Sequence, residues 1–246
     1  MKKYELEKEI SYQDVDFTGN LKLSHLLSVL SELATVHALE LNVWNHDMIE
    51  NYGWVVAKMH IQVEKEIKYE DQVIFKTWPG QPSRAIYPRY YTVEDKKNKQ
   101  RLISISSIWT LLDLKKRRIV MPSRVGIVFP DEIMLEEATS LPSEIICDDQ
   151  FELIATREVR YSDIDTNQHV NNARYLEWIC DVIDIEKFRK YYINDITIAF
   201  KKEITFHQTI YFYAFQKEDS FVVFGSNQDN SLHYFEVEGH WIEKEK

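Results

Sequence analysis

The chain carries one nine-residue pattern twice, as Tyr161-Ser-Asp-Ile-Asp-Thr-Asn-Gln-His169 and, 149 positions earlier (161 − 12), as Tyr12-Gln-Asp-Val-Asp-Phe-Thr-Gly-Asn20. Apolar residues follow each copy at steps of three and four, from Leu23 to Leu41 and from Val170 to Ile183. This spacing predicts one amphipathic helix after each copy. Asn and Asp residues stand just ahead of both runs, where helix N-caps are expected. We therefore interpret the chain as two related halves that open with the same turn and helix.

A second shared stretch follows each predicted helix. Residues 63–78 resemble residues 200–215 and align Glu66 with Glu203, an offset of 137 (203 − 66). The first half is thus 12 residues longer between its matched stretches (149 − 137), and we expect the surplus around 42–53. Alternating apolar and polar residues predict antiparallel strands at Arg89–Val93, Ile103–Leu112, Ile196–Phe200, Ile210–Phe215, Phe221–Gly225 and His233–Ile242. Each half is predicted to be a helix packed on an antiparallel sheet, an α+β fold.

Charged and proline-containing segments divide the chain. Residues 95–99 and 113–118 are typical of charged turns, and the acidic stretch after Pro122 contains two further prolines. We expect an N-terminal domain at residues 1–127, a linker at 128–150 and a C-terminal domain at 151–246.

Composition argues against several classes of protein. The 246 residues include 40 acidic and 30 basic side chains, a net charge of −10 that disfavours nucleic-acid binding. Two cysteines and eight scattered histidines match no disulfide framework or metal spacing. The chain has no Gly-rich phosphate loop and no Gly-x-Ser-x-Gly elbow. We therefore expect neither metal nor cofactor. We find no apolar leader and no membrane-spanning stretch, and expect a cytoplasmic protein that does not bind membranes.

The segment Tyr161–Trp178, with its Asp-x-Asn-x-His-Val-Asn-Asn motif, is similar to the most characteristic stretch of acyl-acyl-carrier-protein (acyl-ACP) thioesterases. Residues 53–61, residues 113–122 and Lys202-Glu203 resemble other parts of that family, so the likeness spans nearly the whole chain. The resemblance implies two tandem hotdog domains, each a long helix wrapped by an antiparallel sheet. It also implies hydrolysis of fatty acyl-ACP to free fatty acid. The absence of a transit peptide favours a bacterial member.

The same resemblance implies a catalytic set of Asp165, Asn167, His169 and Glu203. Glu203 is the preferred base for activating water, with His169 assisting it and Asn167 fixing water or substrate. Asp165 could instead be a nucleophile, or could hold the His and Asn; the sequence leaves these roles open. Plant members have a Cys after the functional Glu, where this chain has Ile204, so a covalent cysteine mechanism is not expected.

Hydrolysis of a thioester also needs hydrogen-bond donors for the oxyanion. The motif runs into a predicted helix N-terminus, where free N–H groups and the helix dipole favour an anion. The backbone N–H groups of Val170 and Asn171 are therefore candidate donors.

The first half lacks part of this set, because Thr18 and Asn20 stand where the second half has Asn167 and His169. We therefore expect one active site, in the second half, and an acyl-binding role for the first. Its helix stripe can be core or pocket wall. The candidate acyl-chain liners are Leu26, Leu30, Ala34 and Trp44.

Charge is unevenly distributed between the halves. Residues 1–130 carry 19 basic and 16 acidic side chains, whereas residues 131–246 carry 11 and 24. The turn Lys115-Lys116-Arg117-Arg118 is either a solvated hairpin or a docking site for the acidic acyl carrier protein.

Three other functions remain open: an acyl-CoA thioesterase, a hotdog dehydratase and a non-catalytic acyl-binding protein. A monomer and a homodimer are both compatible with the sequence.

Overall fold

The computed structural model describes residues 3–48, 50–130, 134–147 and 151–244. The first half contains one long helix and six strands: β1 (Tyr4–Glu9), α1 (Leu23–Glu40), β2 (Tyr52–Val63), β3 (Gln72–Pro79), β4 (Tyr87–Asp95), β5 (Arg101–Asp113) and β6 (Arg118–Ile119). The second half repeats this order with a divided helix: β7 (Glu152–Glu158), α2 (Asn172–Val182), α3 (Ile185–Lys190), β8 (Tyr191–Phe200), β9 (Thr209–Gln216), β10 (Ser220–Ser226) and β11 (His233–Glu243). Single 3-10 turns lie at Tyr12–Asp14, His46–Met48, Pro122–Val125 and Tyr161–Asp163.

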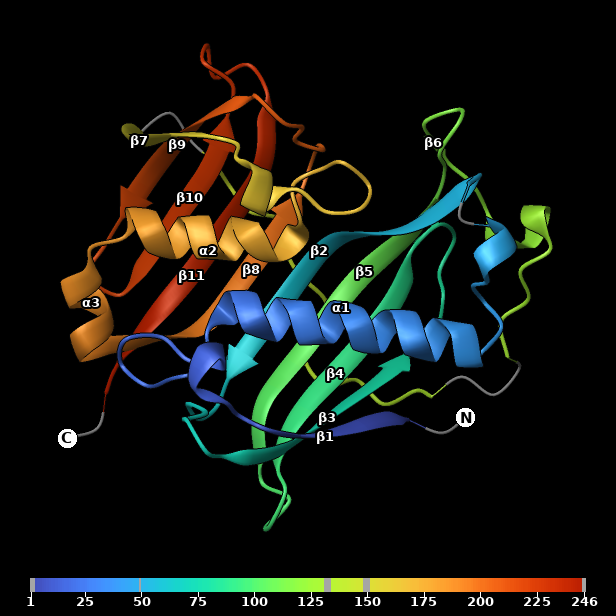
Figure 1. Cartoon of the computed structure of the whole chain (residues 1–246), viewed down its shortest axis with the longest axis horizontal. Helices are drawn as coiled ribbons and strands as arrows, with labels where there is room; N and C mark the ends of the chain where they lie inside the picture. Colours follow the sequence, from blue (N-terminus) through green and yellow to red (C-terminus); the bar gives the residue numbers. More distant parts are fainter. Residues whose placement is uncertain (1–2, 49, 131–133, 148–150, 245–246) are drawn as a thin grey trace.

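All strands belong to one antiparallel sheet, in which the order is β1-β3-β4-β5-β2-β8-β11-β10-β9-β7, with β6 paired to β5. The halves join where β2 pairs with β8 over Lys58–Gln62 and Asp195–Ala199. Helices α1 and α2 lie on the same face of this sheet (Figure 1). The predicted α+β fold and the predicted strands are confirmed, whereas the joining of both halves into one sheet was not predicted.

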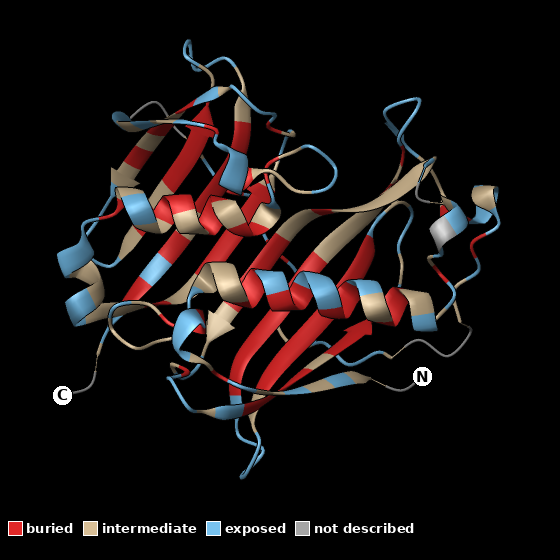
Figure 2. Cartoon of the chain, viewed as in Figure 1, coloured by how far each residue is buried: buried red, intermediate tan, exposed pale blue. Residues whose placement is uncertain are grey.

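Each helix buries its apolar stripe against the sheet (Figure 2). Leu26, Leu30 and Leu33 of α1 and Trp178 and Ile179 of α2 have at most 1% of their surface exposed. The 12-residue surplus of the first half lies where it was expected. Residues 41–51 separate α1 from β2, whereas β8 follows α3 directly.

The N-cap expectation holds for one helix only. Asn171 caps α2, because its side chain accepts a hydrogen bond from the Ala173 N–H at 2.9 Å. Helix α1 begins after Lys22, which makes no side-chain cap. The Asn20 side chain donates instead to Glu66 at 2.7 Å, so it bonds to the segment between β2 and β3 rather than to the helix end.

A buried aspartate anchors each repeated turn. Asp163 is 1% exposed; its carboxylate accepts hydrogen bonds from the Arg160 N–H, from Arg157 and from the Trp178 indole at 2.8–3.3 Å. Its counterpart Asp14 (163 − 149) is 2% exposed and contacts Lys8 and His25. These two residues hold the turns onto the body of the protein.

The segment 134–147 crosses the side of the first-half sheet that faces away from α1. The Ser140 carbonyl accepts a hydrogen bond from Ser106 and lies 3.1 Å from His60 Nδ1. The Glu136 carbonyl accepts from the Trp78 indole at 2.7 Å. This connection therefore covers the sheet near the joint between the halves.

An ion pair at this joint makes the stability of the fold depend on pH. His60 of β2 lies 3.0 Å from Asp195 of β8. Burial lowers the pKa of His60, but hydrogen bonds with Asp195 and the Ser140 carbonyl raise it by more than burial lowers it. The net pKa of His60 is therefore above its ordinary value. Burial raises the pKa of Asp195, and His60 more than offsets this, so its net pKa is low.

The stabilisation is therefore complete between about pH 4 and 6.5 and is lost as pH rises through the folded-state pKa of His60. We expect the melting temperature to fall by about 2–4 °C more between pH 6 and pH 8 in the wild type than in His60→Gln. Thermal melts followed by circular dichroism test this, and parallel pH profiles for the two proteins would contradict it.

Candidate active site

The loop that carries the motif is folded by Asp165. Its Oδ1 accepts hydrogen bonds from the N–H groups of Asn167 at 2.8 Å and His169 at 3.4 Å. The Asp165 N–H donates to the His169 carbonyl at 2.8 Å, and Gln168 takes a positive φ of 63° to close the turn. The loop thus presents the side chains of Asn167 and His169 while the Asp165 carboxylate binds its backbone.

Glu203 is brought to this loop by the turn that follows β8. The Val170 N–H donates to the Ile204 carbonyl at 2.8 Å, and His169 forms a β-bridge with Thr205. His169 Nε2 consequently lies 3.4 Å from Glu203 Oε2, with 28% and 32% of their side chains exposed. The structure therefore places together an imidazole and a carboxylate, a pair able to take a proton from water.

The first half contributes a third charged group. Arg117 lies in the β5–β6 hairpin, where Asp113 Oδ1 accepts the Lys116 N–H and Arg117 adopts a φ of 51°. Its guanidinium donates to Glu203 Oε2. Arg117 was expected in a docking turn, and nothing in the sequence indicates this contact between the two halves.

A cavity of about 530 Å³ opens at Asn167, His169 and Glu203 and extends into the first half. That volume lies within the range of small-molecule sites, about 300–1,000 Å³. Its walls are mainly aromatic and aliphatic, including Ala34, Ala38, Trp44, Trp54, Tyr87, Trp109 and Phe129. Such a cavity can take an aliphatic chain while its carbonyl end remains at the polar mouth.

Three of the four candidate liners, Leu26, Leu30 and Ala34, lie on one stripe of α1, and Trp44 follows that helix; only part of the stripe reaches the cavity. Ala34 and Trp44 lie in the wall, whereas Leu30 is fully buried in the core and Leu26 lines a second cavity. Residues 26, 30, 34 and 38 repeat every four positions, so they share a helix face. The small side chains of Ala34 and Ala38 leave room for the cavity, whereas the larger leucines at positions 26 and 30 occupy the corresponding space.

One buried cation interrupts the apolar wall. Arg89 is 8% exposed, and its guanidinium lies 3.2 Å from Thr77 Oγ1 and 3.3 Å from His37 Nδ1. Burial lowers the pKa of Arg89. Arg89 was not predicted as a site residue, although it shares the inward face of its predicted strand with Tyr91 and Val93.

The predicted oxyanion donors are wrong. The Val170 N–H is bonded to the Ile204 carbonyl at 2.8 Å and the Asn171 N–H to the Asp163 carbonyl at 2.9 Å. Both N–H groups are therefore occupied by backbone hydrogen bonds that hold the motif loop in place at the start of α2. Side chains that line the cavity and can donate instead include those of Asn167, His169 and Arg117.

The equivalent place in the first half holds a different pair. Asn20 and Glu66, the counterparts of His169 and Glu203, are joined by a hydrogen bond of 2.7 Å. An amide cannot accept a proton from water as an imidazole does.

Neither cysteine lines the candidate active-site cavity. Cys180 lies at the second cavity. Cys147 lies near His233 and Glu236, a His/Cys/Glu group in which the Glu236 carboxylate already pairs with His233 and Lys201.

Within the described part of the chain, no helix combines the length and apolar character needed to cross a bilayer. Residues 1–125 match the acyl-ACP thioesterase N-terminal domain and residues 148–242 match the C-terminal domain. The chain is 27% identical over 158 residues to dodecanoyl-[acyl-carrier-protein] hydrolase of Umbellularia californica, a match that covers 62% of this chain and 41% of the relative. It is 28% identical over 162 residues to palmitoyl-acyl carrier protein thioesterase of Arabidopsis thaliana, covering 63% and 39%. The chain therefore spans about two fifths of the length of these curated relatives.

Solved structures share the fold. A thioesterase for acyl-ACP from Bacteroides thetaiotaomicron superposes with a TM-score of 0.84 at 24% identity, over 98% of both chains. The 12:0-ACP thioesterase from Umbellularia californica gives 0.85 at 20% identity, again over 98% of both chains.

Proposed function

Because this chain belongs to the acyl-ACP thioesterase family, we propose that it hydrolyses the thioester of a fatty acyl-ACP and releases free fatty acid and the carrier. One observation carries the proposal. The His169–Glu203 pair lies at a cavity that is large enough for an acyl chain and that has many aromatic and aliphatic residues in its walls. With the chain in that cavity, its thioester carbonyl would lie beside the pair.

In the proposed reaction, Glu203 takes a proton from a water molecule as that water attacks the thioester carbonyl carbon. The Asn167 amide donates to the oxygen on which negative charge develops, in place of the backbone groups that the fold uses. The C–S bond then breaks, and the proton that Glu203 took from water passes through the adjacent His169 to the departing thiolate. This assignment uses side chains that line the mouth of the cavity.

Asp165 is proposed as a positioning residue rather than a nucleophile. Its carboxylate is bonded to the backbone of the motif loop and does not line the cavity. Arg117 is proposed to orient Glu203 through their hydrogen bond.

The function is tested by supplying the same acyl groups on ACP and on CoA and measuring the fatty acid released. We expect hydrolysis with a clear preference for ACP. A preference for CoA would replace the proposed substrate by acyl-CoA. Acyl binding without hydrolysis on either carrier would instead indicate a non-catalytic binding protein.

The basic turn is proposed to guide the acidic carrier to the site. Lys115 and Arg118 are exposed beside Arg117, which itself contacts Glu203. Reversing Lys115 and Arg118 to glutamate is expected to raise KM for acyl-ACP about tenfold, because charge complementarity promotes encounter. KM for an acyl-N-acetylcysteamine thioester, which has no carrier, should not change. Arg117 is left intact because its loss would also disturb Glu203.

A matched control reverses Lys97 and Lys99 on the β4–β5 hairpin. The change in net charge is the same, but this hairpin lies at the opposite end of the strands from the basic turn (Figure 1). Steady-state kinetics of the two double variants decides the matter. An equal effect of both reversals, or a rise in KM for the small thioester, would remove the docking role.

A further inference from the structure

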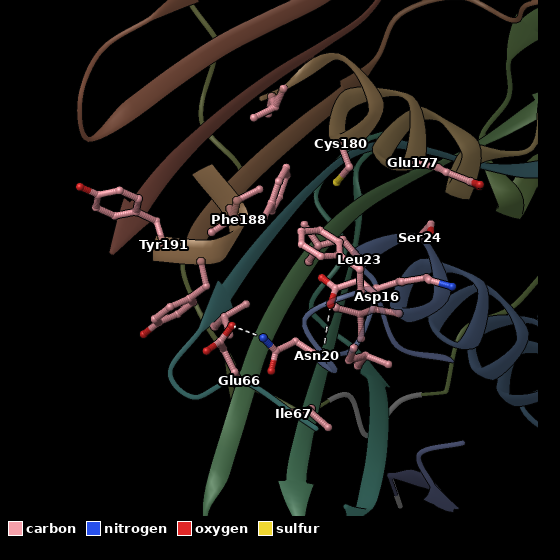
Figure 3. Close-up of a pocket in the computed structure, with 18 of the residues that line it drawn as sticks. Asp16, Asn20, Leu23, Ser24, Glu66, Ile67, Glu177, Cys180, Phe188 and Tyr191 are labelled. Carbon is pink, nitrogen blue, oxygen red and sulfur yellow. Dashed lines mark hydrogen bonds between the residues drawn. The ribbon is translucent and has the colours of Figure 1, made fainter. Parts of the chain in front are cut away.

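A second cavity, of about 480 Å³, lies where the duplication places the counterpart of the candidate active site (Figure 3). Asn20 and Glu66 line it, and they are the repeat equivalents of His169 and Glu203. Lys244, which follows β11, lies 3.2 Å from Glu66 Oε1. Arg117 follows β5, the strand equivalent to β11, and contacts Glu203 in the same way.

The walls correspond as well. Trp54 and Val55 line the active-site cavity, and an offset of 137 takes them to Tyr191 and Tyr192, which line the second cavity. Most of its remaining wall is apolar and comes from both halves, including Leu23, Leu26, Cys180, Ile183 and Phe188. In Figure 3 the Cys180 sulfur and the Phe188 and Leu23 side chains lie around one space, with Asp16, Asn20 and Glu66 at its polar side. This space suits a long aliphatic chain with a polar head.

Charge distinguishes the two cavities. Four carboxylates line the second cavity, those of Asp16, Glu66, Glu177 and Asp181, against two lysines. The active-site cavity instead has two arginines and one glutamate. The acidic surroundings also act on Cys180: burial, followed by the charges of Asp181, Asp16 and Glu177, raises the pKa of its thiol to about 12. An anionic head group is therefore disfavoured here, whereas hydroxyl groups can donate to carboxylate oxygens.

Two of these carboxylates have an oxygen available. Asp16 Oδ1 accepts from Thr18 and from the Asn20 N–H, and Glu66 Oε1 accepts from Asn20 and Lys244. Among the described residues, no donor is bonded to Asp16 Oδ2 or Glu66 Oε2. These oxygens can accept hydrogen bonds from a ligand.

We propose that the second cavity is a non-catalytic binding site for a single-chain lipid with an uncharged, hydroxyl-bearing head, of the monoacylglycerol class. The apolar walls receive the chain, and the carboxylates of Asp16 and Glu66 receive the hydroxyl groups. The ester is bound without being hydrolysed, because Asn20 stands in the position of the imidazole. This site is additional to the proposed thioesterase function and does not depend on it.

A photoreactive monododecanoylglycerol with a diazirine on its chain tests the site, used below its micelle-forming concentration. After irradiation of the wild type, mass spectrometry is expected to find labelled peptides that contain Cys180, Phe188 or Leu23. Cys180→Trp fills the cavity and should reduce this labelling at least about tenfold, whereas the near-isosteric Cys180→Ser should retain it. Ser24→Trp, at a lining residue contributed by α1, is a second blocking variant in case Cys180→Trp does not fold. A diazirine dodecanoate anion should label the same peptides at least about tenfold less than the glycerol ester.

Hydrolysis of acyl-ACP is measured on the same proteins and should remain within about twofold of wild type in both Cys180 variants, since Cys180 does not line the catalytic cavity. Labelling confined to peptides of the active-site cavity would overturn the second site and leave the thioesterase proposal intact. Equal labelling by the anion would overturn the head-group assignment. Absence of hydrolysis together with labelling at Cys180 would remove the thioesterase proposal and leave the second site standing.

Discussion

Replacing Glu203 with glutamine is expected to lower kcat/KM for acyl-ACP by about 10²–10⁴-fold, the usual contribution of a general base. The amide keeps the size of the side chain and can still accept the Arg117 hydrogen bond, but it cannot take a proton from water. Since the aromatic and aliphatic walls of the cavity are unchanged, the loss should fall on kcat more than on KM. Release of fatty acid from purified acyl-ACP at saturating and subsaturating concentrations separates the two parameters.

The duplication supplies the matched control. Glu66→Gln makes the same chemical change at the equivalent position of the first half and should leave kcat/KM within about twofold. His169→Ala should reduce activity to a similar degree as Glu203→Gln, because the two side chains are in contact. A Glu203→Gln enzyme with nearly wild-type kcat would remove Glu203 as the base. A covalent acyl adduct on Asp165, detected by intact mass, would make that residue a nucleophile instead.

Replacing Asp163 with alanine is expected to lower the free energy of unfolding by about 3 kcal/mol. The substitution leaves the buried indole N–H of Trp178 without its acceptor, the Arg157 guanidinium without its buried partner and the Arg160 N–H unpaired. Urea unfolding followed by tryptophan fluorescence gives the change directly.

A control on the same arginine separates burial from charge. Asp181 also contacts Arg157, at 3.4 Å, but 57% of its side chain is exposed. Asp181→Ala should therefore cost less than about 1 kcal/mol, as exposed ion pairs do. Equal losses of unfolding free energy in the two variants would show that the buried hydrogen bonds of Asp163 stabilise the fold no more than the exposed ion pair of Asp181 does.

Much of the fold was predictable because helices and strands have different side-chain periods. The steps of three and four after Asn20 and His169 located α1 and α2, and the alternation of residues 196–200 and 210–215 located parts of β8 and β9. The pairing of β2 with β8 was not predictable in the same way. The alternation of side chains identifies a strand, but it does not specify which other strand lies beside it.

The candidate site also combines residues that could be predicted from local sequence with residues that only the folded structure brings together. Asn167 and His169 could be predicted because the motif loop is local in sequence, and the resemblance to acyl-ACP thioesterases added Glu203. Arg117 and Arg89 come from the first half, and only the folded chain brings them to the same cavity. The oxyanion prediction for Val170 and Asn171 failed because the hydrogen bonds to Ile204 and Asp163 depend on tertiary structure.

The pairing of β2 with β8 has a consequence for symmetry. A dimer of two identical halves joined along these strands would carry two identical sites, since any change in one copy appears in the other. Here both halves belong to one polypeptide, so Asn20 and His169 can differ at equivalent places. The fused chain escapes the constraint of a twofold axis, and each of its two cavities can be shaped for its own ligand.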